Sequence, residues 1–311
     1  MCYEAGPTGY ALYRLLLTLN IHCTVIAPSL IPQRPGERIK TDRRDSVRLA
    51  QLYRAGELTS VYVPTPEDEA LRDLVRCRED AVEDELRAKH RLSKFLLRYD
   101  IQPPSKGKKW TVRYYRWLDT LKFENSKLQV VFREYYHQIK EIQQRILRLE
   151  EEIRIQATDS DHAPIIQALQ TLRGVALITA TSIAAEIGSF KRFSTPRHFM
   201  AYVGLVPSEY SSGECRKQGK ITKTGNRHVR RLLVESAWSY RYKPGVKGEL
   251  QKRQNGQSPM VLAISWKAQN RLHKKYFRLL SRGKESGKAI TAVARELAGF
   301  IWAITQVLNR C

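Results

Sequence analysis

The stretch that decides the fold is Leu128–Ile153, LQVVFREYYHQIKEIQQRILRLEEEI. Apolar side chains recur along it at alternating spacings of four and three residues, which is the heptad pattern of a coiled-coil seam. The seam consists of Leu128, Phe132, Tyr135, Ile139, Ile142, Ile146, Leu149 and Ile153. We therefore expect one long helix, roughly 40 Å in length at ~1.5 Å per residue.

A second, charged helix is expected over residues 66–99. Its apolar side is made of Leu71, Leu74, Val75, Val82, Leu86 and Leu92. Two arrangements remain open for the seam: it packs against the 66–99 helix within one chain, or it joins two chains as a dimer-forming arm.

The region before this arm has an α/β pattern. The expected elements are a helix at 10–20, a buried strand at 23–28, a helix at 41–55 capped by Thr41 or Asp42, and a short strand at 61–63. A loop rich in Pro and Arg runs to Gly36. A complete α/β domain usually needs about 100 residues. We therefore expect that an N-terminal portion of the domain is missing.

The region after the arm is predicted to be mainly helical. Residues 157–163 are polar and precede Pro164, which is typical of a linker. Helices are expected at 165–172 and 177–187, and the last helix, 289–308, is apolar on a broad face and expected to be buried.

Charge narrows the range of partners. The chain carries 54 Lys and Arg against 31 Asp and Glu, a net charge of +23. Residues 201–311 alone hold 22 Lys and Arg against six acids. This excess indicates a polyanionic partner, most often nucleic acid. Ribosomal and membrane-surface proteins tolerate similar charge, so charge alone assigns no function.

Several classes of protein are excluded. No run of 18 apolar residues exists, so no transmembrane helix is expected, and the first residues lack the features of a signal peptide. The five cysteines are scattered and none forms a CxxC motif, which argues against a zinc ribbon or a disulfide framework. We expect a cytoplasmic protein without membrane contact.

Three acids could hold a metal ion. Asp42 and Asp45 lie three residues apart at the start of a predicted helix, on one face. With Glu4 at the end of a strand they would offer the hard oxygen ligands that suit Mg²⁺. The alternative is that the two Asp only stabilise the helix N-terminus through its dipole.

Ser211 and Ser212 lie in the Gly-bounded loop 204–213. A serine beside a glycine in a tight loop can expose its hydroxyl as a nucleophile, provided that a base or metal activates it. Serines are also common in loops that have no catalytic role.

Two further stretches could bind nucleic acid. The run 216–231 has seven Lys and Arg in sixteen residues without an intervening acid, and it leads into a helix N-terminus. Its candidate contacts are Lys217, Lys220, Lys223, Thr224, Asn226, Arg227, Arg230 and Arg231. The turn 169–176, with Arg173 and Gly174, could offer backbone N–H groups to a phosphate in the manner of a helix-hairpin-helix motif. A solvated loop and an ordinary turn between helices are the respective alternatives.

Taken together, these stretches resemble a known family. YEAGPTGY (3–10), VIAPS (25–29) and KTDRRDS (40–46) look like the DEDD transposases of the IS-one-ten insertion-sequence family, related to the Piv DNA invertase. Gly174-Val175, YVGLVP (202–207), SSG (211–213) and TKTGN (222–226) look like that family's C-terminal domain. The resemblance covers essentially the whole chain.

The resemblance implies a fold of class α/β plus mainly α. It divides the chain into a partial RuvC-like (RNase H-fold) domain at 1–64, a helical arm with a coiled coil at 65–156, and a helical transposase domain at 157–311 with a helix-hairpin-helix-like turn. It implies a bacterial or archaeal, nucleoid-associated protein that forms a homodimer or tetramer through the coiled coil.

The resemblance also implies a DNA transposase or recombinase guided by a structured bridge RNA. Ser212, with Ser211 as the alternative, would be the nucleophile that links covalently to DNA. Glu4, Asp42 and Asp45 would bind Mg²⁺ as the second, third and fourth acids of the DEDD set, and the acids of one subunit would meet the serine of another.

Two departures from the family pattern keep other functions open. The first Asp of the DEDD set belongs on a strand before Glu4, and the second glycine of the hairpin turn is Ala176 here. The alternatives are a catalytically incomplete relic that binds nucleic acid, and a Holliday-junction-type nuclease that hydrolyses DNA with metal ions and no covalent step.

Overall fold

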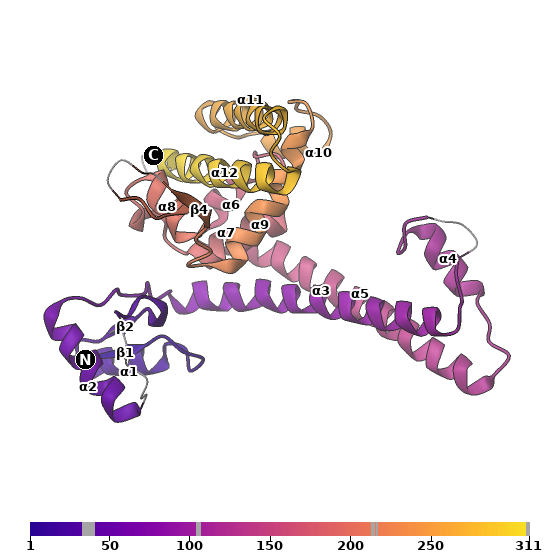
Figure 1. The fold of residues 1–311 in the computed structure, drawn as a ribbon, viewed down its shortest axis with the longest axis horizontal. Coiled ribbons are helices and arrows are strands. Elements are labelled where there is room, and N and C mark those ends of the chain that lie inside the picture. Colours follow the sequence, from indigo (N-terminus) through magenta and orange to yellow (C-terminus); the bar gives the residue numbers. More distant parts are fainter. Residues whose placement is uncertain (33–40, 104–106, 213–214, 216, 309–311) are drawn as a thin grey trace. The chain divides into compact units, whose positions relative to one another are not determined.

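The computed structural model describes residues 1–32, 41–103, 107–212, 215 and 217–308. The chain forms two compact units, Met1–Glu67 and Asp68–Cys311. The described residues are mainly helical and contain two small two-stranded sheets (Figure 1). The mainly α part of the predicted fold class, α/β plus mainly α, is therefore confirmed. None of the described helices has both the length and the apolar character that a bilayer crossing requires.

The first unit is built around a short parallel sheet. Its elements are β1 (Cys2–Glu4), α1 (Ala11–Thr18), β2 (Thr24–Ile26), the 3-10 turn η1 (Pro28–Leu30) and α2 (Asp42–Ala55). β1 pairs with β2 so that Glu4 lies opposite Ile26. Thr41 caps α2, because its hydroxyl accepts a hydrogen bond from the backbone N–H of Arg44.

The predicted strand at 61–63 is wrong. The chain makes only an isolated antiparallel bridge from Ser60 to Ile26, and Val61 N donates to the carbonyl of Val25. Pro64 is buried directly afterwards and has no N–H with which to continue a ladder. The Pro- and Arg-rich loop lies partly outside the described residues, since 33–40, including Lys40, are not among them.

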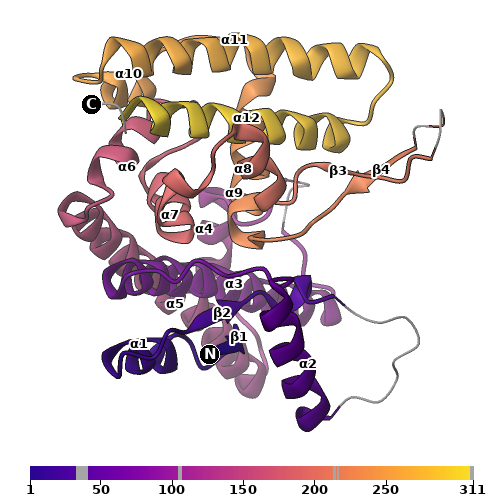
Figure 2. The same ribbon diagram turned by 90° about the vertical axis from the view of Figure 1, so that its left-hand side faces the viewer.

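The second unit begins with a helical arm of three helices: α3 (Pro66–Arg98), α4 (Val112–Thr120) and α5 (Ser126–Asp159). α3 and α5 lie side by side in both ribbon views (Figures 1 and 2). They run antiparallel, because Arg78 bonds to Glu150 while Gln143 donates to Glu85. α5 extends through Asp159, so the predicted linker at 157–163 is wrong in its first part.

The heptad seam of α5 packs within the chain. Phe132, Ile139 and Ile153 are buried and the other seam residues are half-buried. On α3, however, Leu86 is 54% exposed and lies off the contact face, contrary to prediction. The structure thus shows the intrachain arrangement, while a coiled coil that joins two chains stays a prediction.

An aromatic cluster closes the far end of the arm. Phe95 of α3 lies 5.5 Å from Phe123 and 5.7 Å from Tyr135, measured between ring centroids. α4 adds Tyr114 and Leu118, both buried. Such rings bury much apolar area with few rotatable bonds. This cluster therefore fixes the turn between α3 and α5.

The rest of the second unit is a body of helices around α12. Its elements are α6 (Ala163–Leu169), α7 (Leu177–Ile187), η2 (Phe190–Arg192), α8 (Pro196–Tyr202), β3 (Pro207–Glu209), β4 (Gln218–Ile221), α9 (Arg227–Ala237), η3 (Trp238–Arg241), α10 (Glu249–Gln254), α11 (Pro259–Ser281) and α12 (Ser286–Leu308). α12 packs against α6, α8, α9 and α11. β3 and β4 are antiparallel, with Pro207 opposite Ile221.

The prediction that the last helix is buried is confirmed. Ala289, Val293, Leu297 and Ile301 of α12 have no measurable exposure. Alternation of alanine with larger aliphatic residues lets several neighbours pack closely around one helix.

The bounds of two shorter helices can also be compared with the prediction. α7 has the predicted bounds, whereas α6 ends three residues earlier than predicted.

A buried carboxylate joins the arm to the body. Glu186, on α7, has a side chain only 2% exposed. It accepts two hydrogen bonds from Arg76 of α3, at 2.6 and 3.0 Å, and one of 2.7 Å from the side-chain amide of Asn226. Asn226 in turn caps α9 through the backbone N–H of Val229. Three segments far apart in sequence therefore meet at one side chain.

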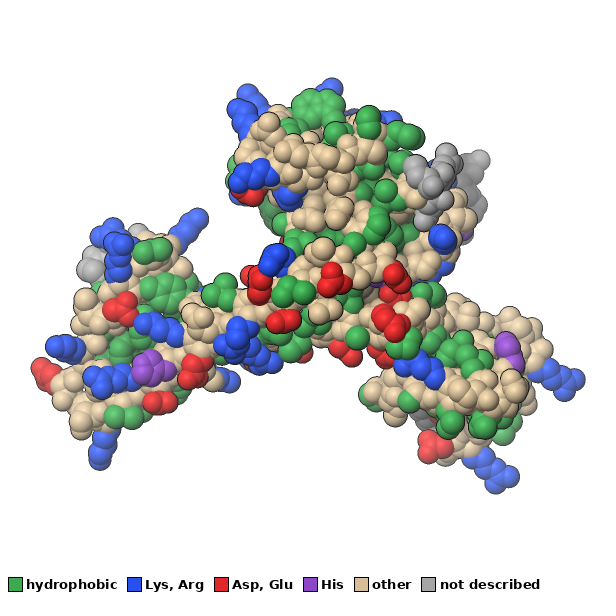
Figure 3. Space-filling view, turned by 180° about the vertical axis from the view of Figure 1, so that it is seen from behind, with side chains coloured by type: hydrophobic (Ala, Val, Ile, Leu, Met, Phe, Trp, Pro, Cys, Tyr) green, Lys and Arg blue, Asp and Glu red, His purple; other side chains and the backbone are tan. Residues whose placement is uncertain are grey.

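A second contact of the same kind lies beside it. Glu79 of α3 accepts a 2.9 Å bond from His228 and pairs at 2.9 Å with Arg231, both on α9. Figure 3 shows acidic side chains gathered where the arm lies against the body. The acids of α3 thus meet basic residues of α9 at this junction.

The hydrogen bonds of Glu186 decide its protonation. Burial alone would raise the pKa of this carboxyl, but the bonds from Arg76 and Asn226 outweigh burial and lower the pKa below its ordinary value of 4.5. The carboxylate therefore stays ionised inside the protein and contributes to stability in that form.

We predict that Arg76→Ala lowers the free energy of unfolding by about 2–4 kcal/mol, because it leaves the Glu186 charge buried with only Asn226 as partner. Arg87→Ala is the control: Arg87 pairs with Asp84 on the exposed side of α3, and its loss should leave the free energy of unfolding nearly unchanged. Urea denaturation followed by circular dichroism measures both, and equal losses would contradict the role of Glu186.

The same network predicts a pH dependence. Since the folded-state pKa of Glu186 is lowered, its contribution is present above the unfolded value near 4.5 and is lost as pH falls through the lower folded value. The stability difference between the wild type and Glu186→Gln should therefore shrink on acidification below about pH 4.5. A difference that stays constant from pH 7 to pH 3 would contradict this.

Candidate functional site

Both candidate serines lie near the tip of a β-hairpin. Beyond β3 and β4 the hairpin continues with a 2.9 Å bond from Tyr210 N to the Lys217 carbonyl and a bridge between Ser212 and Cys215. Figure 2 shows the hairpin extending away from the helices of the body. The serine loop and the first part of the basic run, predicted as separate loops, are therefore the two sides of one hairpin, whereas the end of the run, from Arg227, lies on α9.

The two serines differ in their contacts. The hydroxyl of Ser211 donates to Oε1 of Glu209 at 2.9 Å, which places a carboxylate within proton-transfer distance. Ser212 exchanges backbone hydrogen bonds with Cys215, at 3.2 and 3.1 Å, so its main chain is held in place. Both serines are exposed. Gly213, which completes the predicted motif, lies outside the described residues.

Two glycines fix the base of the hairpin. Gly204 and Gly225 both have positive φ, at 67° and 65°. A Cβ on Gly204 would lie 2.3 Å from the Thr224 carbonyl oxygen, and one on Gly225 would lie 1.9 Å from that of Tyr202. The segments that lead into and out of the hairpin, next to α8 and α9, cross too closely here for any side chain, so both positions require glycine.

Arg230 braces the same crossing from α9. Its Nη1 donates to the carbonyls of Val203, at 3.0 Å, and Thr224, at 2.9 Å. Lys223 N donates to the Gly204 carbonyl at 3.1 Å. The hairpin is therefore tied on both sides to the body, and its tip is aimed by a rigid base.

The predicted nucleic-acid contacts divide into two groups. Asn226, Arg230 and Arg231 are engaged inside the protein, as described above, and Thr224 bonds to Thr222 and to Arg230. The remaining four have exposed side chains that make no hydrogen bond or ion pair with any described residue. These four are Lys217, Lys220, Lys223 and Arg227. Arg216 lies outside the described residues.

The predicted helix-hairpin-helix turn packs against the body. A Cβ on Gly174 would lie 2.5 Å from the Ser236 carbonyl oxygen. Arg173 donates to the carbonyls of Tyr242, at 3.3 Å, and Lys243, at 2.6 Å. The close approach explains why this turn has a glycine, with positive φ, at position 174. The guanidinium of Arg173 is already bonded to backbone carbonyls of the body.

The three predicted metal-binding acids lie in the first unit. Glu4 ends β1 and is exposed, and Asp42 and Asp45 lie in the first turn of α2, exposed and half-buried respectively. α2 packs against β1. Their carboxylates are the donors that a hard divalent cation prefers. In the described ranges, however, no three His, Cys, Asp or Glu side chains come together as a metal site.

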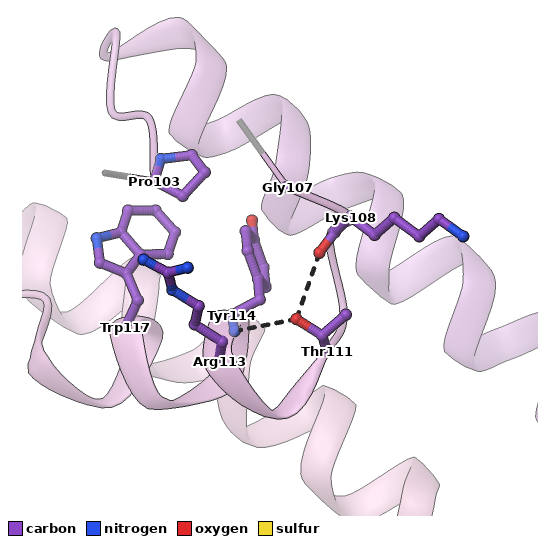
Figure 4. Close-up of a pocket in the computed structure, with 7 residues that line it drawn as sticks. All are labelled: Pro103, Gly107, Lys108, Thr111, Arg113, Tyr114 and Trp117. Atoms are coloured by element: carbon purple, nitrogen blue, oxygen red, sulfur yellow. Dashed lines mark hydrogen bonds between the residues drawn. The ribbon is translucent and has the colours of Figure 1, made fainter. Parts of the chain in front are cut away.

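A small pocket lies at the far end of the arm (Figure 4). Its described lining is Pro103, Gly107, Lys108, Thr111, Arg113, Tyr114 and Trp117. The Thr111 hydroxyl donates to the Lys108 carbonyl and accepts from Tyr114 N, both at 3.4 Å, and so caps α4. Among these described lining residues there is no acid, histidine or cysteine, so they offer no side-chain ligand set of the kind that binds a metal ion.

Sequence reasoning missed Glu186, Arg76 and Glu209. A lone carboxylate within the apolar run ATSIAAEI (180–187) was a signal for a buried, paired charge. Its partners lie 110 and 40 residues away, so spacing could not identify them.

Two family models match the chain. One, described as the transposase IS116/IS110/IS902 family, matches residues 166–249 and so includes the hairpin. The other, a DEDD transposase model of the IS110 type, matches residues 1–101, which include all three acids.

Curated relatives match over most of the chain. A Sinorhizobium fredii protein named as a transposase, y4qE, is 47% identical over 98% of this chain and 75% of its own length. The transposase for insertion sequence element IS1533 of Leptospira borgpetersenii is 35% identical over 91% of this chain and 83% of its own length. The transposase for IS1328 of Yersinia enterocolitica is 28% identical over 76% and 69%.

We predict that Gly225→Ala destabilises the hairpin base. The added methyl would overlap the Tyr202 carbonyl, so the backbone must move and the braces from Arg230 are lost. Gly283→Ala is the matched control, because Gly283 also has positive φ, 72°, but open space around it. The control should cost about 1–2 kcal/mol for the left-handed conformation alone, and Gly225→Ala at least about 2 kcal/mol more.

Urea unfolding of the two variants measures the difference. Equal destabilisation would show that the backbone conformation alone, and not the close approach to the Tyr202 carbonyl, requires glycine at this position.

Proposed function

The chain belongs to the IS110 family of insertion-sequence transposases, and from this premise we propose that it cuts and rejoins DNA through a serine on the β3–β4 hairpin, guided by RNA. The observation that carries the proposal is the hairpin itself. It combines two exposed serines, a base tied to the body, and exposed lysines on its second strand.

Ser212 is our proposed nucleophile. Its hydroxyl oxygen would bond to the phosphorus of the scissile phosphodiester while one P–O bond to the DNA strand breaks. The serine proton is lost, and the leaving strand oxygen gains a proton. The phosphoserine ester that forms retains the energy of the broken phosphodiester bond. A hydroxyl at another strand end can therefore attack this ester, which releases the serine and rejoins the DNA.

The environment of Ser211 makes it the alternative nucleophile. Its 2.9 Å bond to Glu209 is the geometry of a nucleophile beside a general base. If Ser212 attacks instead, this bond would shape the tip of the hairpin. The two serines therefore need separate substitutions in the test below.

The exposed basic side chains of the hairpin and of the start of α9 fit a phosphate backbone. We propose that Lys217, Lys220, Lys223 and Arg227 contact phosphates near the serines, since no described group neutralises them. Arg173, Gly174, Thr224, Asn226, Arg230 and Arg231 would instead hold the shape of this surface through the contacts described above.

Glu4, Asp42 and Asp45 are our proposed metal ligands. DEDD transposases generally use divalent metal ions, and the carboxylates fit Mg²⁺ in chemistry. A bound ion would supply charge neutralisation at the reacting phosphate. We also propose that the first domain, 1–64, has a RuvC-like fold. It is followed by a coiled-coil arm, 65–156, that joins two chains, and by a transposase domain, 157–311.

We predict that Ser212→Ala abolishes the covalent protein–DNA adduct. The wild type, incubated with junction DNA of its element, guide RNA and Mg²⁺, should form a species that migrates more slowly on a denaturing gel. Ser211→Ala and Glu209→Gln should retain it. An adduct lost only in Ser211→Ala would move the nucleophile to Ser211.

Cleavage without any adduct, in the wild type and in both serine variants, would instead support a hydrolytic nuclease. DNA binding without cleavage would support a catalytically incomplete nucleic-acid-binding protein.

We further predict that Asp42→Asn combined with Asp45→Asn weakens Mn²⁺ binding, measured by electron paramagnetic resonance, by more than about tenfold, because two carboxylate ligands are lost. The matched control replaces Asp159 and Asp161, two exposed acids beside the α5–α6 connection, by Asn. An equal effect in both variants would show non-specific ion binding and contradict the assignment.

A further inference from the structure

Helix α11 presents a stripe of basic side chains to solvent. Lys267, Arg271, Lys274 and Arg278 are all exposed and recur at spacings of four, three and four residues. With 3.6 residues per turn these positions lie on one side of the helix and extend over about 16 Å. The opposite side of α11 packs on α12 and η3. This stripe is separate from the β3–β4 hairpin.

The charges of this stripe are only partly compensated. Glu296 of α12 pairs with Arg271 at 3.0 Å and with Lys275, which is 10% exposed. Lys267, Lys274 and Arg278 form no ion pair with the described residues. All of these residues line an open groove of about 480 Å³ with Asn270. Three cations thus face a shallow groove that contains one paired acid.

Two exposed aromatic rings lie along α11 beside the basic stripe. Trp266 and Phe277 are 47% and 48% exposed, although they are among the largest apolar side chains of the body. They lie eleven residues apart, hence on one line along the helix, about 100° around the axis from the basic stripe. His273 supports Phe277 edge-on at 4.8 Å and is itself bonded to the Tyr240 carbonyl.

We propose that this face of α11 binds single-stranded nucleic acid, with successive phosphates on the basic stripe and unpaired bases stacked on Trp266 and Phe277. Phosphates explain a line of uncompensated cations. Unpaired bases explain the exposed rings, because every base has a face that stacks on an aromatic side chain, whereas paired bases in a duplex are already stacked. The chemistry is common to RNA and DNA strands.

The test measures binding of the full chain to labelled oligo(U), oligo(dT) and a DNA duplex of equal length by fluorescence anisotropy. One variant combines Lys267→Ala, Lys274→Ala and Arg278→Ala. We expect at least tenfold weaker binding to both single strands, and a slope of log affinity against log salt smaller by about 2, given ~0.7 per phosphate contact. Its control removes Lys94, Lys127 and Arg133 from the arm, which is the same charge.

A second variant combines Trp266→Ala and Phe277→Ala. We expect about tenfold or greater loss on the single strands and an unchanged affinity for the duplex. A larger loss on oligo(U) assigns the face to RNA, and a larger loss on oligo(dT) assigns it to DNA. Since all five residues are exposed, unchanged thermal unfolding checks that both variants fold.

Three results would overturn the proposal. The first is unchanged single-strand binding in the basic variant. The second is a loss no larger than in the arm control. The third is an aromatic variant that weakens duplex and single-strand binding equally. Because none of these substitutions touches the hairpin or the three acids, adduct formation by Ser212 can fail or succeed independently of this result.

Discussion

The buried carboxylate of Glu186 is the contact on which the architecture of the second unit depends. An ionised acid inside a helical body is costly unless hydrogen bonds replace its hydration. Here the replacements come from Arg76 on the arm and from Asn226, the residue that ends the hairpin connection and begins α9. One side chain therefore fixes both where the arm meets the body and where the hairpin returns to it. Hydrophobic packing alone, which is not directional, would set neither angle as tightly.

The hairpin follows from this anchor. Asn226 stands directly after Gly225, and Gly225 crosses the Tyr202 carbonyl at a distance that excludes any Cβ. Arg230, one turn into α9, then binds the carbonyls on both sides of the crossing. The strands beyond are short and polar and bury little, so they have no core of their own to hold them. The contacts at the base therefore set the direction of the two strands. This arrangement is expected where a side chain must be both exposed and held in a defined position.

What could be predicted from the sequence follows the range of the interactions. The bounds of α7, the start of α3 at Pro66 and the cap of α2, predicted at Thr41 or Asp42, depend on neighbours within a few residues, so local periodicity and capping rules could predict them. The partners of α12 are distant helices, but its broad apolar face is itself a local pattern, and this face predicted its burial. The hairpin was missed because QGKI in β4 and PSE in β3 lack apolar alternation, and their pairing is imposed by glycines at the base. Leu86 was misplaced because its neighbours on α5 do not reach that side of α3. The partners of Glu186 could not be predicted, because they lie 110 and 40 residues away in the sequence.

The number of basic residues in a segment does not by itself indicate a binding site, because some of them are already paired within the protein. In the run 216–231 the Lys and Arg look equivalent, yet Arg230 binds backbone carbonyls and Arg231 binds Glu79 and Glu235, while Lys217, Lys220 and Lys223 meet no described acid or acceptor. A cation already paired gains little from a phosphate, because a new contact must replace an old one. A solvated cation gains the full release of counterions. The same distinction on α11 separates Arg271, which is held by Glu296, from Lys267, Lys274 and Arg278. Uncompensated cations on a rigid helix or hairpin, and not the net charge of the chain, therefore mark where a polyanion can bind.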